Sequence, residues 1–165
     1  MQIAQVTAEH ADLLPVSPGS YILVLRADQH ATIPVGRLGA LPIAPGWVLY
    51  TGSAFGTGGL RGRVRHHLRP VTHPHWHIDY LRRACTVVEI WYSVDAHRWE
   101  HAWATALAQS ARPIPGFGAS DCHCVAHAFH RTHQPELACF VADIGRLNQP
   151  LNDIGRGAMY CARTG

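Results

Sequence analysis

Three runs of β-branched and aromatic residues are separated by helical patterns, which excludes an all-α and an all-β domain. Residues 19–27 (GSYILVLRA), 47–53 (WVLYTGS) and 86–94 (TVVEIWYSV) predict strands. Helices are expected over 60–69, 77–83 and 97–110, where apolar residues recur at three- and four-residue intervals. This order predicts an α+β domain, in which a small, mostly antiparallel sheet is flanked by helices.

The connecting segments give weaker signals. A strand over 31–35 would form a hairpin with 19–27, inserted before the strand at 47–53, and residues 39–46 would form a loop with two prolines. The run LACFVADI (137–144) predicts a last strand, and residues 148–165 a loose C-terminal tail. No linker or repeat divides the chain, so its 165 residues predict a single domain over 1–165.

Composition excludes several classes of protein. With 47% apolar residues the chain can form a core, yet no stretch approaches the roughly 20 apolar residues of a membrane span. The first residues, MQIAQVTAEHADLL, lack the basic start and apolar run of a signal peptide. The five cysteines are odd in number and irregularly spaced. We therefore expect a cytoplasmic protein with reduced thiols and no membrane partner.

Basic residues gather in one segment. All 14 basic residues are arginine, which suits phosphate but also fits a codon bias. Asp79 is the only acid between residues 61 and 83, so this segment predicts a polyanionic partner. Its arginines and one aromatic residue are the candidate nucleic-acid contacts: Arg61, Arg65, Arg69, Trp76, Arg82 and Arg83.

The stretch HWHIDYL (75–81) allows two interpretations. On a helix, Trp76 and Tyr80 would share a side, and next to Arg82 and Arg83 they could stack on bases or sugars. They could equally be a core-facing aromatic pair.

Within the predicted helix 60–69, Arg63 and His67 lie one turn apart along one edge of the apolar stripe. Such a pair can grip one phosphate, or it can belong to a solvated basic face on which the Arg63 alkyl chain packs. Glu100 lies in the next long helix at the edge of a tryptophan stripe, and no arginine lies three or four residues away. It could ligate a cation, meet a charge from elsewhere in the fold, or simply be exposed.

Soft metal ligands occur close together after residue 120. Cys122, Cys124 and His127 could bind zinc, with His130, His133 or another residue as the fourth ligand. Alternatively, the two thiols only pack.

Two tyrosines complete an ordered pattern. Gly19-Ser20-Tyr21 begins the first strand and Tyr50-Thr51-Gly52 ends the third, before the helix with Arg63 and the helix with Glu100. A single strand tyrosine is usually a core residue. The ordered set, however, resembles the GIY-YIG nuclease superfamily. Within that superfamily the chain resembles an uncharacterised branch, whose members are sometimes fused to endonuclease III-like repair enzymes. This second resemblance lies in the stretches YTGSAFGTGGLRGRVRHHL, HWHIDYL and GFGASDCHC.

The resemblance covers residues 18–145 and implies a metal-dependent endonuclease, acting on DNA in repair or processing. It implies catalytic roles for Tyr21, Tyr50 and Arg63, and one Mg²⁺ or Mn²⁺ held by Glu100. Tyr21 or His67 would be the base, and His67 is better suited near neutral pH.

The chain also departs from the family pattern. Serine and threonine replace two isoleucines. The asparagine that often follows the glutamate helix in the family has no match, because the only asparagines, Asn148 and Asn152, lie in the predicted tail. Two alternatives to the nuclease therefore remain: a nucleic-acid-binding module of the same fold without hydrolysis, and a zinc-stabilised interaction domain.

Overall fold

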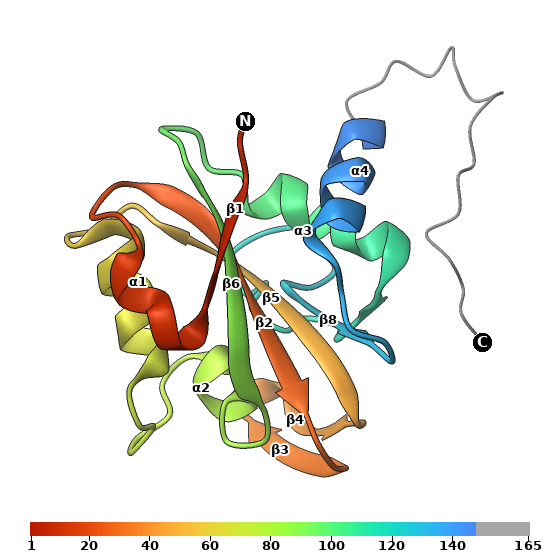
Figure 1. Cartoon of the computed structure of the whole chain (residues 1–165). Coiled ribbons are helices and arrows are strands. Elements are labelled where there is room, and N and C mark those ends of the chain that lie inside the picture. Colours follow the sequence, from red (N-terminus) through yellow and green to blue (C-terminus); the bar gives the residue numbers. More distant parts are fainter. Residues whose placement is uncertain (148–165) are drawn as a thin grey trace, which may run out of the picture.

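The computed structural model describes residues 1–147, so the predicted tail at 148–165 lies outside the described residues. A six-stranded sheet with the order β1-β6-β2-β5-β8-β7 forms its centre, and every pairing in it is antiparallel (Figure 1). The strands are β1 (Ala4–Thr7), β2 (Gly19–Ala27), β5 (Gly46–Ala54), β6 (Thr86–Val94), β7 (Arg112–Pro113) and β8 (Ala128–Arg131).

Helices cover both faces of this sheet. On one face lie the 3₁₀ helix η1 (Ala8–Leu13), α1 (Gly59–Leu68) and α2 (His77–Leu81). On the other lie α3 (Glu100–Ser110) and α4 (Leu137–Leu147), which pack on each other. A separate two-stranded sheet of β3 (Ala31–Val35) and β4 (Gly39–Ile43), joined by the 3₁₀ helix η2 (Gly36–Leu38), packs on the α1 face.

The sheet separates two apolar clusters, and β2 contributes to both. Tyr21, Leu23 and Leu25 face the cluster under α1 and α2, while Ile22 and Val24 face the cluster under α3 and α4. Because side chains alternate along a strand, a strand with helices on both sides is apolar at successive positions. This explains the continuous run that predicts β2.

The α+β fold with a central antiparallel sheet is confirmed. The predicted strands 19–27, 47–53 and 86–94 and the helix 60–69 agree with β2, β5, β6 and α1 to within a residue at each end. The predicted helix 97–110 is confirmed from Glu100 onward as α3.

The expected partner of residues 31–35 is wrong. A hairpin does lie between the two tyrosine motifs, but β3 pairs with β4, while both sides of β2 are taken by β5 and β6. The segment 39–46, predicted as a loop, contains β4 and the start of β5. Its proline at 42 is tolerated because a two-stranded sheet has only edge strands.

The predicted strand 137–144 is also wrong, because these residues form α4. Leu137, Phe140 and Ile144 pack on the same apolar cluster, a spacing of three and four that suits a helix. A short apolar run does not by itself distinguish the two structures.

Two expectations from composition can be compared with the structure. No helix within residues 1–147 is both long and apolar enough to cross a membrane. Cys85, Cys122 and Cys124 are free, but the expectation of reduced thiols is wrong for Cys139, which is disulfide-bonded. The odd, irregular cysteine pattern carried no sign of a pair.

Candidate functional site

The two tyrosine motifs lie side by side on β2 and β5, on the face that α1 covers. In the antiparallel register Tyr21 is opposite Gly52, and Leu23 is opposite Tyr50. A Cβ atom at position 52 would overlap the hydroxyl and ring of Tyr21. The glycine of the second motif therefore makes room for the tyrosine of the first.

We expect Gly52→Ala to lower the free energy of unfolding by about 1–3 kcal/mol, the usual cost of overpacking a core. The new methyl group would push the Tyr21 ring from its position. Urea denaturation measures this loss, with Gly56→Ala as the control, because a Cβ at position 56 meets no atom within 4 Å. Equal stability of the two variants would contradict this explanation of the motif.

His67, from the last turn of α1, binds the first tyrosine. The Tyr21 hydroxyl and His67 Nε2 are 2.7 Å apart, and each residue is only 2% exposed. The Tyr50 ring lies edge-on to the imidazole, with ring centroids 6.4 Å apart. His67 Nδ1 is buried and has no hydrogen-bond partner within residues 1–147.

Burial keeps these groups neutral. Burial, and then the charge of Arg63, lowers the pKa of His67 to about 3. Burial raises the pKa of Tyr21 well above its usual value, Tyr50 and Glu100 add to this, and Arg63 opposes it. Burial, followed by Glu100, likewise raises the pKa of Tyr50. At neutral pH the pair is a phenol and an uncharged imidazole.

The lowered pKa of His67 predicts a loss of stability in acid. In the unfolded chain, His67 takes up a proton as the pH falls below its ordinary pKa of 6.5. In the folded protein, His67 stays neutral until the pH falls to its lowered pKa of about 3. Stability from this residue is therefore lost as the pH falls through that window, by about 1.4 kcal/mol per pH unit.

Urea denaturation of wild type and His67→Gln between pH 6 and 4 tests this expectation. As the pH falls, the difference in free energy of unfolding between wild type and His67→Gln should shrink with that slope, because glutamine does not titrate. His73→Gln, at an exposed position, is the control and should keep a constant difference. A constant difference for His67→Gln would show that the imidazole is not held neutral.

Arg63 is half-buried and lies one turn before His67 in α1. Its guanidinium carbon is 4.8 Å from the ring centroid of Trp76, and the Arg63 side chain is in no ion pair within residues 1–147. A pocket of about 290 Å³ is lined by Arg63, His66, Trp76 and small residues of the turn at 54–62. This cation is therefore available to an anion.

Several of the other predicted contact residues bind the protein itself. Arg69 and Arg83 are exposed, and Trp76 is 38% exposed. The other three arginines have these partners: Arg61 Nε donates to the Leu14 carbonyl at 2.6 Å, Arg65 Nε lies 3.0 Å from Asp12 Oδ1, and an Arg82 terminal nitrogen donates to the Arg69 carbonyl at 2.7 Å.

The HWHIDYL stretch has mainly a structural role. Asp79 Oδ2 accepts the backbone N–H groups of His75 and Trp76, each at 2.9 Å, and so caps α2. His77 Nδ1 accepts the Gly118 N–H at 2.7 Å, which fixes the loop before Cys122. Trp76 precedes the helix and lines the pocket, whereas Tyr80 packs against the apolar cluster under α1 and α2.

Glu100 begins α3 and contacts one residue of β5 and one of the loop before β8. Its Oε1 lies 3.0 Å from His127 Nδ1, and its side chain is 18% exposed. Burial alone would raise the pKa of this carboxyl, but hydrogen bonds from His127 and Ser53 outweigh it, and the net pKa is lowered. Glu100 is therefore ionised, and its charge reaches Tyr21 and Tyr50.

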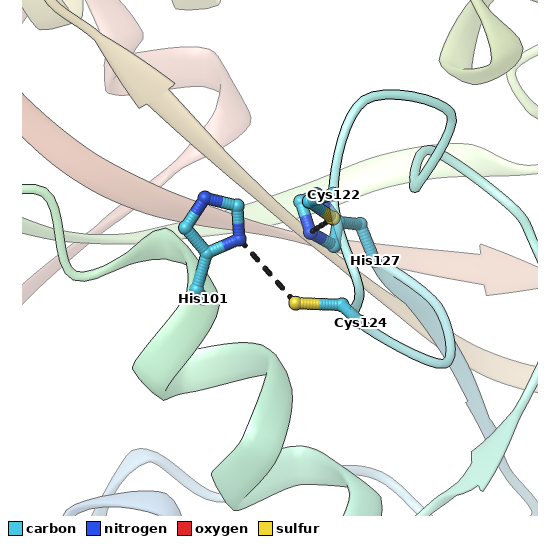
Figure 2. A group of neighbouring side chains, drawn as sticks. All are labelled: His101, Cys122, Cys124 and His127. Atoms are coloured by element: carbon cyan, nitrogen blue, oxygen red, sulfur yellow. Dashed lines mark hydrogen bonds between the residues drawn. The ribbon is translucent and has the colours of Figure 1, made fainter.

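Next to Glu100, four possible metal ligands converge (Figure 2). They are His101, Cys122, Cys124 and His127, whose ligand atoms all lie within 4.8 Å of one another. This group could hold a metal ion. Sequence reasoning found three of the four but missed His101, which comes from α3 rather than from the cysteine loop.

The two histidines considered as a fourth ligand lie elsewhere. His130 Nε2 contacts the carbonyl oxygens of Ala44 and Pro45, each at 3.2 Å, and His133 is not part of the group. The only sequence signal for His101 is its place directly after Glu100, at the start of a helix that packs next to β8.

The candidate catalytic residues therefore lie close together on the face of the sheet that α1 covers: Tyr21, Tyr50, Arg63 and His67. Glu100, at the start of α3, is close enough for its charge to act on both tyrosines.

No curated protein and no solved structure matches the chain in sequence or structure comparisons. One family model matches residues 20–148, which include every candidate site residue. The chain therefore belongs to the family described as Domain of unknown function DUF123.

Proposed function

We propose that the protein is a metal-dependent endonuclease of the GIY-YIG type, which hydrolyses phosphodiester bonds of DNA in repair or processing. One observation carries the proposal: a buried tyrosine–histidine hydrogen bond near an ionised glutamate and an arginine that is in no ion pair within residues 1–147. Phosphodiester hydrolysis needs a proton acceptor for water, and positive charge where negative charge develops.

The arrangement assigns different roles to the two candidate bases. His67 is buried and its Nε2 is occupied by Tyr21, so it can act only through the tyrosine. In the proposed step, water attacks phosphorus and the P–O bond to the leaving group breaks, and the leaving oxygen keeps the electron pair and takes up a proton from solvent. The water proton goes to the Tyr21 oxygen while the Tyr21 proton passes to His67 Nε2. The negative phosphate offsets the charge of Arg63, which contributes to the low pKa of His67.

Glu100 fits a divalent cation. It is ionised, partly exposed and held in place by its contacts with His127 and Ser53. Mg²⁺ is commonly bound by one or two carboxylates, with phosphate and water as its other ligands. When bound, Mg²⁺ or Mn²⁺ would supply a Lewis acid for the scissile phosphate.

Exposed arginines and an exposed aromatic residue suit a nucleic-acid strand. Arg63 and Trp76 line the pocket, and Arg69 and Arg83 add exposed positive charge. An exposed indole can stack on a base while arginines contact phosphates. We propose that Trp76 and these arginines position the strand and that Arg63 contacts the scissile phosphate.

A second candidate function is a DNA-binding module of this fold that does not cut. It is favoured by the burial of Tyr21, which is 2% exposed and whose pKa is raised. A phenol of this kind gives up its proton only when another group accepts it.

The discriminating experiment is a cleavage assay on nicked, branched, flapped and damaged DNAs, with RNA in parallel. Mg²⁺ or Mn²⁺ is added to protein dialysed free of loosely bound ions, without a strong chelator that would also strip the cysteine–histidine group. We expect cutting of at least one substrate only when the cation is present. Binding without cutting of any substrate would overturn the nuclease and favour the module.

A further inference from the structure

We propose that His101, Cys122, Cys124 and His127 bind one Zn²⁺ in a closed tetrahedral site, and that this zinc holds Glu100 in place through His127. The zinc site stands on its own observations. Its effect on Glu100 rests on the nuclease proposed above.

The donor set selects the metal. Two thiolates and two imidazoles are the ligands of structural zinc, whereas Mg²⁺ and Ca²⁺ prefer oxygen. Four protein ligands leave no open position for water or substrate, as in structural rather than catalytic zinc sites. Two thiolates also balance the charge of the ion.

The distances fit a tetrahedral ion. Zinc lies about 2.3 Å from sulfur and about 2.0–2.1 Å from nitrogen, so a sulfur and a nitrogen on one ion are about 3.5 Å apart. His101 Nδ1 and Cys124 Sγ are 3.3 Å apart, and Cys122 Sγ and His127 Nε2 are 3.4 Å apart (Figure 2). On loading, these two pairs would shift by only a few tenths of an ångström, while the widest separation in the group, 4.8 Å, would shorten to the roughly 3.3–3.8 Å between ligands on one tetrahedral zinc.

Backbone hydrogen bonds hold the loop that carries three of the ligands. Gly116 N–H donates to the Val125 carbonyl at 2.8 Å, and His127 N–H donates to the Phe117 carbonyl at 2.7 Å. The His127 carbonyl in turn accepts the Thr51 N–H of β5 at 2.8 Å. The ligands are therefore held on a braced turn rather than on a free loop.

His127 connects the metal group to the carboxylate. Its Nε2 faces Cys122, and its Nδ1 lies 3.0 Å from Glu100 Oε1. A metal on Nε2 leaves the proton on Nδ1, which then donates to the carboxylate, as metal-bound histidines commonly do. His101 directly follows Glu100 in α3, so the ion would also fix the first turn of that helix.

The first test is metal content of the full chain, purified without chelator from zinc-supplemented cells. We expect one zinc per chain, and on exchange for Co²⁺ an intense visible spectrum with a thiolate charge-transfer band, typical of a tetrahedral site with sulfur ligands. This measurement needs neither a variant nor nuclease activity. Protein that contains no zinc and takes up neither ion would overturn the site.

Variants then test the four-ligand assignment. His101→Ala should weaken zinc retention against a competing chelator by about tenfold or more, while His123→Ala should not change it. His123 is the matched control because it lies between the two cysteines, is exposed and is outside the group. Equal retention in both variants would remove His101 from the site.

The link to Glu100 has two readouts. In long-range ¹H–¹⁵N spectra of the zinc-loaded protein, His127 should show a protonated Nδ1 and a metal-bound Nε2. His101→Ala should also raise the Mg²⁺ concentration for half-maximal cleavage by about 10–100-fold, the usual effect of an outer-shell change. An unchanged Mg²⁺ requirement in zinc-depleted protein would overturn the link and leave the nuclease standing. No cutting by wild type would overturn the nuclease and its dependence on zinc, and would leave the zinc site, which metal content measures, standing.

Discussion

Glu100→Gln is expected to lower the turnover of DNA cleavage about 1,000-fold or more, with little change in DNA affinity. The bound cation would contribute several kcal/mol to the transition state, and each 1.4 kcal/mol corresponds to about tenfold in rate. Glutamine keeps the shape of the side chain and an oxygen that can accept the His127 N–H. It removes the charge that would hold the cation. Single-turnover kinetics and equilibrium binding measure the two effects separately.

Two controls show whether this loss is local. Glu136→Ala removes an exposed acid just before α4 and should leave turnover unchanged. Zinc content of Glu100→Gln should stay at the wild-type value, because the four proposed ligands remain. A fall in turnover of less than tenfold would mean that Glu100 does not hold a cation required for cutting. Glu100→Ala should be equally inactive, and a difference between the two variants would report on the contact with His127.

The long strands could be predicted because their burial is uniform. β2 has helices on both faces, so nearly all of its residues are apolar and its pattern cannot be confused with an exposed loop. The short segment 137–144 was ambiguous, since its apolar residues at 137, 140 and 144 suit a helix while the run is no longer than a strand. The helix is favoured by packing on α3 and β6, where the Phe140 ring contacts Trp103 and Trp91.

Strand pairing was harder to predict than strand position. Residues 31–35 follow β2 after a short turn, which favours a hairpin between neighbours in the sequence. β3 does not pair with β2 because β5 and β6 already pair with the two edges of β2. Local sequence does not show that these two strands are the partners of β2. The actual partner of β3 is β4, and the proline at 42 conceals its extended conformation in the sequence.

The candidate site was predictable where one helix turn or one motif carries the geometry. Arg63 and His67 were placed on one edge of α1 by spacing alone, and the burial of His67 agrees with that edge. The Tyr21–His67 bond joins residues 46 positions apart and the Glu100–His127 contact joins residues 27 positions apart, so no local pattern reports them. His101 was missed for the same reason. A metal ligand contributed by a distant helix becomes visible only once that helix is placed.

Arg63→Ala is expected to lower turnover by ~100-fold or more, the usual cost of removing one preorganised donor from a developing anion. Affinity for DNA should fall much less, because the contact strengthens as negative charge develops on the phosphate. Arg63→Lys should rescue poorly, since an ammonium cannot reproduce the two-pronged guanidinium contact. The loss of the contact with Trp76 costs stability only by about 0.5–1 kcal/mol, which a thermal melt would show.

Arg69→Ala and Arg65→Ala are the matched comparisons, because both arginines lie within six residues of Arg63 at the same end of the protein. Arg69 is exposed and Arg65 pairs with Asp12, so neither faces the tyrosine–histidine pair. An exposed phosphate contact such as Arg69 should contribute about one unit to the salt dependence of binding and little to turnover. If all three variants lose affinity equally and turnover hardly at all, Arg63 belongs to a binding surface, and the tyrosine–histidine pair next to it is a piece of the core.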